Sequence, residues 1–198
     1  AYILDPSGFP NAAVLKTNAQ LGRLQVSRLS GDTDGDGDFD EIHSFGGRAF
    51  SIWSASGDLV FDSGDQFEQV VKTQLPLNFN ANNTNNDRDS RSDDSGPEPE
   101  CLVLGHAFGR QLAFIGLERI GGVMVYDVTD PANARFSNYV NNRDFGVRPG
   151  AGTIPPNPLP NTGDLSPESI TFIKEDDSPN GRPLLVVTNE VSSTTTLF

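Results

Sequence analysis

A run of five aspartates, each separated from the next by one residue, carries the clearest metal-binding pattern in the sequence. The run consists of Asp32, Asp34, Asp36, Asp38 and Asp40. Carboxylates at alternate positions of a tight loop supply oxygen ligands to a hard cation, and Gly37 at the sixth position permits the sharp turn. The backbone carbonyl of Asp38 would complete the shell. The spacing therefore predicts a Ca²⁺ site, since Mg²⁺ tends to keep its waters.

The twelfth residue of the loop, counted from Asp32, distinguishes two kinds of calcium loop. A helical EF-hand requires glutamate there, whereas this chain has His43. A shorter aspartate-rich loop between two strands fits the sequence better, and it resembles the calcium loops of integrin-type propeller blades. The alternative is a solvated acidic loop without a cation, in which the carboxylates would repel one another.

A second group of carboxylates follows from two Pro-Glu pairs. Glu100 and Glu168 each begin an apolar stretch, and Glu118 and Glu190 each end the next one. In an antiparallel meander, the start of one strand and the end of the next lie at the same edge. We therefore expect Glu100 beside Glu118, and Glu168 beside Glu190.

These carboxylates are expected to meet at the mouth of a central channel, with Glu98 nearby. Converging carboxylates bind a cation or have raised pKa values. Glu100 and Glu168 are the candidate catalytic residues, and Glu98, Glu118 and Glu190 are further channel carboxylates. In the alternative interpretation, Glu118 pairs with Arg119 or Arg143 and the other glutamates face water.

Other catalytic chemistry has little support in the sequence. No nucleophile elbow, phosphate-cradling glycine loop or zinc-binding His-Glu-x-x-His motif is present. The two histidines, His43 and His106, are expected to be structural or surface residues. Arg119 and Arg143 could each bind a phosphate group through paired hydrogen bonds.

Composition excludes several classes of function. The chain has 27 acidic and 14 basic residues, a net charge of −13, so nucleic acid is not an expected partner. No apolar stretch is long enough to span a membrane. A single cysteine permits neither an internal disulfide nor a cysteine-based zinc site. The 20 glycines and 14 prolines indicate many turns.

The first hundred residues contain few regular elements. We predict a strand at 24–29, a hairpin of strands at 48–53 and 58–61, and a helix at 65–75. The helix has an apolar face, and Asp65 and Glu68 have the spacing of a capping box. Residues 78–97 have almost no apolar content, which predicts a long polar insertion.

The last hundred residues contain a repeat. The copies comprise 99–104, 111–118 and 122–128, and then 167–173, 183–190 and 192–198. Each copy has a Pro-Glu start, a strand, a turn, a strand that ends in Glu, and a third strand. Such self-similarity predicts an all-β fold of stacked four-stranded meanders, the blades of a β-propeller. A β-sandwich with two similar hairpins is the alternative.

The predicted blades are too few to close a propeller ring. Propellers have roughly four to eight blades, whereas the sequence contains two copies and the hairpin near Trp53. We therefore expect residues 1–198 to be the C-terminal portion of one propeller domain, with the calcium loop at 32–40 and the insertion at 78–97. A missing N-terminal part or a second chain would complete the ring.

Several long motifs resemble the choice-of-anchor I family. They are Gly46-Gly47-Arg48-Ala49-Phe50-Ser51-Ile52-Trp53, Asp89-Ser90-Arg91-Ser92-Asp93-Asp94, Gly96-Pro97-Glu98-Pro99-Glu100, Phe114-Ile115-Gly116-Leu117-Glu118-Arg119 and Asn189-Glu190-Val191. The resemblance implies a β-propeller that is secreted, periplasmic or anchored at the cell surface. Family members are often labelled alkaline-phosphatase-like or phytase-like, and related animal glycoproteins are associated with biomineral skeletons. This sequence departs from the pattern at Cys101, Ser166 and Ser169, where glycines are expected.

Two functions remain open at this point. One is calcium-dependent phosphoester hydrolysis, in which carboxylate-bound cations polarise the phosphate and an arginine clamps it. The other is a non-catalytic, calcium-stabilised protein that binds a matrix or mineral surface. The second function needs only the aspartate loop and the negative field of the chain.

Overall fold

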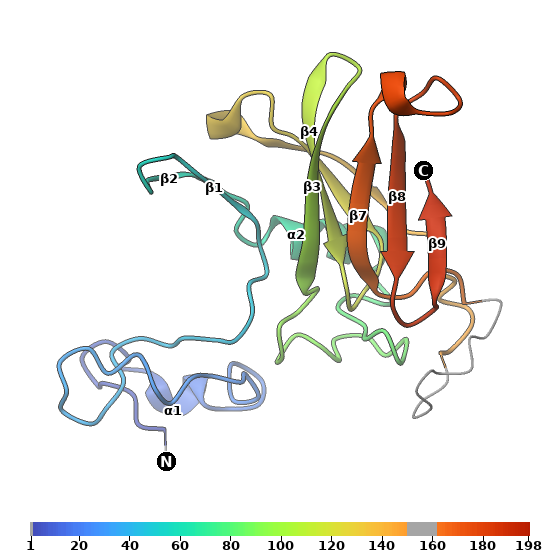
Figure 1. Cartoon of the computed structure of the whole chain (residues 1–198). Helices are drawn as coiled ribbons and strands as arrows, with labels where there is room; N and C mark the ends of the chain where they lie inside the picture. The colour runs from blue at the N-terminus through green and yellow to red at the C-terminus, as the bar shows by residue number, and fades with distance from the viewer. Residues whose placement is uncertain (1, 150–161) are drawn as a thin grey trace. The chain divides into compact units, whose positions relative to one another are not determined.

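Residues 2–149 and 162–198 are described by the computed structural model of the chain (Figure 1). They divide into two units. Unit 1 comprises Ala1–Gly46 and Ser92–Ser95, and unit 2 comprises Gly47–Arg91 and Gly96–Phe198. The metal-loop prediction falls in unit 1 and the glutamate prediction falls in unit 2.

Unit 2 is built from antiparallel strands in three sheets. The first is a hairpin of β1 (Ser51–Trp53) and β2 (Leu59–Asp62), followed by helix α2 (Gln66–Gln74). The second contains β3 (Pro99–Ala107), β4 (Arg110–Leu117), β5 (Val123–Asp127) and β6 (Arg135–Val140). The third contains β7 (Pro167–Ile173), β8 (Leu184–Asn189) and β9 (Thr194–Leu197). Short 3₁₀ helices η1 (Pro131–Asn133) and η2 (Glu175–Asp177) lie in the connections.

Strand order follows the chain in each sheet, which is the meander that the repeat predicts. The all-β class is confirmed, and the two larger sheets are consistent with partial propeller blades. The repeat did not predict β6, whose side chains are mostly exposed. This strand is defined by its pairing with β5 rather than by an apolar pattern of its own.

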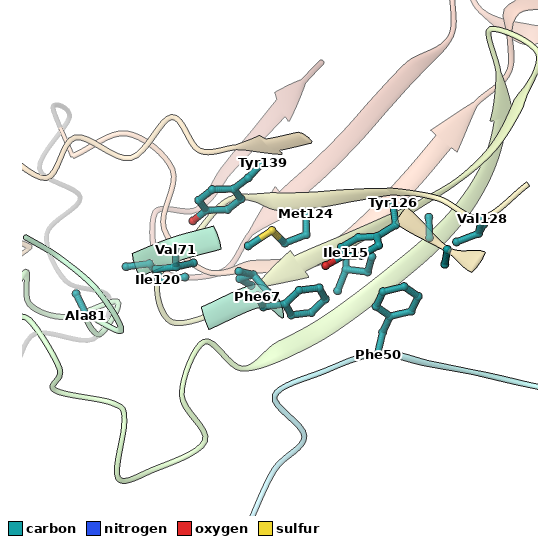
Figure 2. Packing of buried hydrophobic residues seen from close by; sticks show 13 residues of the cluster. Phe50, Phe67, Val71, Ala81, Ile115, Ile120, Met124, Tyr126, Val128 and Tyr139 are labelled. Carbon is teal, nitrogen blue, oxygen red and sulfur yellow. The ribbon is translucent and has the colours of Figure 1, made fainter. Parts of the chain in front are cut away.

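The four-stranded sheet packs against other elements on both faces, although Leu102 and Leu104 of β3 remain about half exposed. On one face, side chains from β4 and β5 pack against α2 and Phe50, as Figure 2 shows. Tyr126, which is fully buried there, stacks edge-on against Phe50 and donates a hydrogen bond to Gln66. A two-layer sandwich would leave one face of each sheet in water. Coverage of both faces matches a blade that lies between neighbours.

The other face of this sheet packs against the three-stranded sheet. The apolar cluster between them contains Cys101, Val103, Phe114, Val123, Ile170, Phe172, Leu185 and Val187. The first strands, β3 and β7, lie side by side (Figure 1). Gly105 of β3 permits this approach, because a Cβ atom there would lie 2.5 Å from the ring of Phe172. The repeated strands therefore form stacked layers.

The predicted helix at 65–75 is confirmed as α2, but its capping box does not form. Asp65 makes no side-chain cap hydrogen bond, and it accepts a bond from the side chain of Gln69 instead. Glu68 accepts hydrogen bonds from Arg48 at 3.0 Å and from Asn80 at 2.6 Å. The stronger pairing with a guanidinium group draws Glu68 away from the helix start.

The polar insertion is a loop, as its composition predicts, yet several of its side chains are buried. No helix or strand occurs between Gln74 and Pro99, all of which the structure describes. Asn80, Ala81 and Asn83 are nevertheless buried. The amide groups of Asn80 and Asn83 donate hydrogen bonds to Glu68, Glu118 and Ser166, which lowers the cost of their burial. The insertion thus contributes to the interior of unit 2 without an apolar core of its own.

Unit 1 contains little regular structure. Helix α1 (Ala12–Leu15) is present, but the strand predicted at 24–29 is wrong. Within residues 24–29 only Val26 forms a bridge, to Ser44, and Leu29 is 99% exposed. Alternation alone does not make a strand where a neighbouring strand is absent, and this segment has one bridging residue and no adjoining sheet.

None of the helices in the described part of the chain has the length and apolar character needed to cross a bilayer.

The contact between β3 and β7 leads to the first prediction. Gly105→Ala should lower the free energy of unfolding by about 1–3 kcal/mol, because the new methyl group overlaps the ring of Phe172. Urea denaturation measures the change. Gly47→Ala is the matched control, since its Cβ would meet no atom closer than 3.9 Å. Equal stability of the two variants would contradict the packing described here.

Candidate metal-binding sites

The aspartate loop of unit 1 is organised by hydrogen bonds from its own backbone. Asp32 accepts bonds from the amides of Gly35 at 2.7 Å and Gly37 at 3.1 Å. Gly35 and Gly37 both have positive φ angles, which favour glycine. Asp40 accepts bonds from the amide and hydroxyl of Thr33. These contacts hold the first and last aspartates of the loop in fixed positions.

Three of the five predicted aspartates come together. Ligand oxygens of Asp32, Asp34 and Asp40 all lie within 4.8 Å of one another. Asp36 and Asp38 are not members of this group. Each takes part in a hydrogen bond between an aspartate side chain and the amide two residues later. Asp34 accepts from the amide of Asp36, and Asp36 accepts from that of Asp38.

The carboxyl groups of the loop have divergent acidities. Partial desolvation and the charges of Asp36 and Asp5 raise the pKa of Asp38. Hydrogen bonds from Thr33 lower the pKa of Asp40. Asp40 is therefore held ionised, as a cation ligand must be.

In unit 2, the two Pro-Glu pairs occupy equivalent β-bulges. Pro99 pairs with Leu117 and Cys101 pairs with Gly116, which leaves Glu100 as the extra residue of β3. In the other sheet, the register shift between Pro167 and Ser169 leaves Glu168 as the extra residue. A bulge redirects a side chain that regular alternation would place elsewhere.

The residue before each of these prolines has the same unusual backbone. Glu98 has φ 55° and Ser166 has φ 63°, a conformation that is uncommon outside glycine. Each carbonyl accepts a 2.8 Å hydrogen bond from the amide of the glutamate that directly follows the next strand, Glu118 after β4 or Glu190 after β8. The repeat seen in the sequence is therefore a repeat of local geometry.

Glu98, Glu100 and Glu118 form a compact carboxyl cluster. Ligand oxygens of the three residues lie within 4.8 Å of one another. Glu100 is exposed, Glu98 is half-buried, and Glu118 is only 5% exposed. The meander argument correctly placed Glu100 and Glu118 at one edge of the sheet.

Two arginines face this cluster. Arg119 pairs with Glu118 at 2.8 Å and also with Glu98, and Arg91 lies 3.5 Å from Glu98. Two expectations that were alternatives at the level of the sequence therefore hold together: Glu118 pairs with Arg119, and the carboxyl groups of Glu98, Glu100 and Glu118 converge. The arrangement has both signs of charge, with the carboxyl groups in excess.

The two oxygens of Glu118 have different environments. Oε1 accepts a hydrogen bond from Asn83 at 3.1 Å and lies 2.8 Å from Nη1 of Arg119. Oε2 is buried and has no hydrogen-bond partner among the described residues. An unpartnered buried carboxylate oxygen is costly, so it favours a proton or a cation.

The pKa values follow from this crowding. Burial raises the pKa of Glu118 to about 8, and contact with the Glu98 carboxyl group adds to the shift. Burial opposes ionisation of Glu98 as well, but hydrogen bonds from Arg119 and Glu118 outweigh it and lower the pKa of Glu98. Protonated Glu118 can therefore donate to ionised Glu98.

Glu168 and Glu190 act on this cluster through their charges. Desolvation raises the pKa of Glu100, and the charges of Glu168, Glu98 and Glu190 raise it further. Glu168 and Glu190 are both exposed. They are not members of the group of three, so they supply negative charge nearby rather than additional close ligands.

Arg143 has a structural environment. Its guanidinium group donates to the carbonyls of Arg119, Ile120, Asn82 and Asn85 and to the side chain of Asn86. It also lies over the ring of Phe145 at 4.6 Å. The contacts attach the polar insertion to the end of β4. They give no support to the predicted role of Arg143 in phosphate binding, because its terminal nitrogens are already engaged.

Two residues of the site were not identified from the sequence. Asn83 bridges the repeats, because its Nδ2 donates to Glu118 at 3.1 Å and to Ser166 at 2.8 Å. Asn83 lies in a run of asparagines with no distinguishing pattern. Ser166 could have been found by aligning the repeats, since it occupies the position of Glu98 before the Pro-Glu pair.

Comparisons with known proteins identify relatives. The sequence profile of the choice-of-anchor I domain matches residues 1–131. Gigasin-3a from Magallana gigas is 32% identical over 93% of this chain, which spans 66% of that protein. A mesenchyme-specific cell surface glycoprotein from Strongylocentrotus purpuratus is 29% identical over 63% of this chain and 18% of its own length. No solved structure matches the chain significantly.

The second prediction concerns pH. The pKa of Glu118 rises from 4.5 to about 8 on folding, so the folded state binds more protons between these values. The stability due to this proton is fully present below pH 4.5 and is lost as pH rises through about 8. Glu118→Gln, which cannot ionise, should remove this part of the pH dependence, on the order of 2 kcal/mol.

Urea unfolding in EDTA at about pH 5.5 and about pH 8.5 measures this effect. EDTA removes cations that would compete with the proton. Glu175→Gln is the matched control, because Glu175 is exposed and lies away from the cluster in η2. Parallel pH profiles for the parent and Glu118→Gln would contradict the protonation of Glu118.

Proposed function

Because the chain belongs to the choice-of-anchor I family, we propose that it functions outside the cell as a calcium-binding protein of the β-propeller type. The observation that carries this proposal is the convergence of Asp32, Asp34 and Asp40 within 4.8 Å in a pre-formed loop. Ca²⁺ accepts carboxylate oxygens in irregular geometry, so this loop suits it better than Mg²⁺, which requires near-octahedral geometry. Asp36 and the carbonyl of Asp38 would complete the shell after a local adjustment.

The family and one relative support an extracellular location. The sea urchin relative is named a cell surface glycoprotein. We propose that this chain is likewise secreted or held at a cell surface, where calcium is abundant. Its net charge of −13 would concentrate cations around it.

The proposed partner is an extracellular matrix or mineral surface. Exposed carboxylates and their bound calcium can bridge to anionic groups on such a surface. We also propose that the two larger sheets are blades of a larger ring. The remaining blades would come from an N-terminal part or from a second chain.

The third prediction tests the calcium loop. Calcium should raise the melting temperature of the parent by about 5 °C or more at concentrations well above its dissociation constant, because it binds the native state. Asp34→Asn should reduce this rise, since it removes a ligand charge but keeps the acceptor for the amide of Asp36. Differential scanning calorimetry measures the transition. Asp176→Asn, at an exposed aspartate, is the matched control.

A calcium-induced rise that is equal in the parent and in Asp34→Asn would contradict the loop site. Absence of any rise in the parent would contradict calcium binding altogether.

Phosphoester hydrolysis is a second candidate function. It is favoured by one observation, the position of Arg119 between Glu98 and Glu118 in a cluster that includes the bulged Glu100. Glu100 and Glu168 would hold cations that polarise the phosphate, and Arg119 would contact it. Two nitrogens of Arg119 already contact carboxyl groups, which leaves fewer donors for a phosphate group. The calcium-binding function is therefore better supported than phosphoester hydrolysis.

The fourth prediction separates these functions. If the chain is a hydrolase, p-nitrophenyl phosphate or phytate should be turned over with calcium and not with EDTA. Glu100→Gln and Glu168→Gln should each then reduce turnover by about 100-fold, while Glu175→Gln should not. Absence of turnover in the parent at saturating calcium would remove the hydrolase hypothesis and leave the calcium-binding function intact.

A further inference from the structure

We infer that Glu98, Glu100 and Glu118 form a second divalent-cation site, at the start of β3 and the end of β4, which calcium occupies. The site shares no residue with the aspartate loop. The inference does not depend on whether the chain hydrolyses phosphoesters.

The composition of the cluster suits calcium. Ligand oxygens of the three glutamates lie within 4.8 Å of one another, so one cation could be shared among them. All three ligands are carboxylates, and Ca²⁺ accepts such oxygens in irregular geometry, whereas Mg²⁺ requires near-octahedral geometry and tends to keep its waters. Calcium is therefore the expected cation.

Glu118 provides an observation that is independent of the clustering. This side chain is buried, and its Oε2 has no hydrogen-bond partner among the described residues. Its other oxygen is fixed by Asn83 and Arg119. Rotation of the carboxyl group toward water would break both of those contacts. A cation beside Oε2 satisfies the oxygen without disturbing them.

The charge of the surroundings also favours a cation. Glu168 and Glu190 act electrostatically on Glu100, so five carboxyl groups contribute to the field at this place. Two guanidinium groups oppose them, those of Arg91 and Arg119. Both arginines contact Glu98, which leaves Glu100 without an ion pair among the described residues. A divalent cation would neutralise most of the remaining charge.

The backbone positions two of the three ligands before any cation binds. A bulge redirects Glu100, and the positive φ of Glu98 sets the direction of the chain just before it. Glu118 is fixed by the hydrogen bond from its amide to the Glu98 carbonyl. Ligand positions that are set in the fold reduce the ordering cost of binding.

Calcium stoichiometry tests the inference. Isothermal titration calorimetry would use the full chain, stripped of metal with EDTA and exchanged into about 150 mM NaCl to screen diffuse binding. The starting protein is the double variant Asp32→Asn/Asp34→Asn, which disables the aspartate loop. We expect this protein to bind one calcium ion per chain, more tightly than magnesium.

Adding Glu100→Gln to that double variant should weaken the remaining site by about tenfold or more, because one ligand charge is lost. Adding Glu175→Gln, the matched control, should not change it. Circular dichroism verifies the fold of each protein, and Glu100 is exposed and unpaired, so its replacement should be tolerated.

Two outcomes would overturn the inference. One is that the double variant binds no calcium, in which case a proton alone satisfies Glu118. The other is that Glu100→Gln and Glu175→Gln leave the remaining affinity equal. Absence of calcium binding at the aspartate loop would be a separate result. In that case the parent and the double variant would bind the same number of calcium ions per chain.

Discussion

The arrangement of unit 2 depends on a carboxyl group that is buried where two repeats meet. Glu118 directly follows β4, accepts a hydrogen bond from Asn83 of the polar insertion, and pairs with Arg119. Through Asn83 it is linked to Ser166 at the start of the next repeat. Burial of an acid is costly without partners, and Asn83 and Arg119 supply them for Oε1. The insertion, the first sheet and the start of the second sheet therefore have to meet at one place.

The two repeats share a backbone design but differ in charge. In each, a residue with positive φ precedes a proline, and a bulged glutamate follows. The first position is Glu98 in one copy and Ser166 in the other. Glu98 adds a third carboxyl group to its cluster, whereas Ser166 accepts a hydrogen bond from Asn83. The same scaffold thus forms a carboxyl cluster in one copy and a neutral contact in the other.

The sequence predicted the elements in which buried side chains recur at regular spacing. It did not predict the features that depend on contacts with residues distant in the chain. The strands of both repeats and helix α2 follow from apolar spacing, because each has one face against a core. The segment 24–29 has a similar alternation but one bridging residue. Glu100 and Glu118 could be paired from meander geometry alone. Asn83 could not, because only the fold brings residue 83 to residue 118.

The two carboxyl clusters differ in their surroundings, and this difference governs how each responds to its medium. The aspartate loop is largely exposed, so dissolved salt screens its charges. Glu118 is buried, so its charge is poorly screened and burial raises its pKa to about 8. A proton and the proposed cation would compete for the same buried oxygen. Proton binding and cation binding at this junction would then be linked, and Asn83 ties Glu118 to the packing of the repeats.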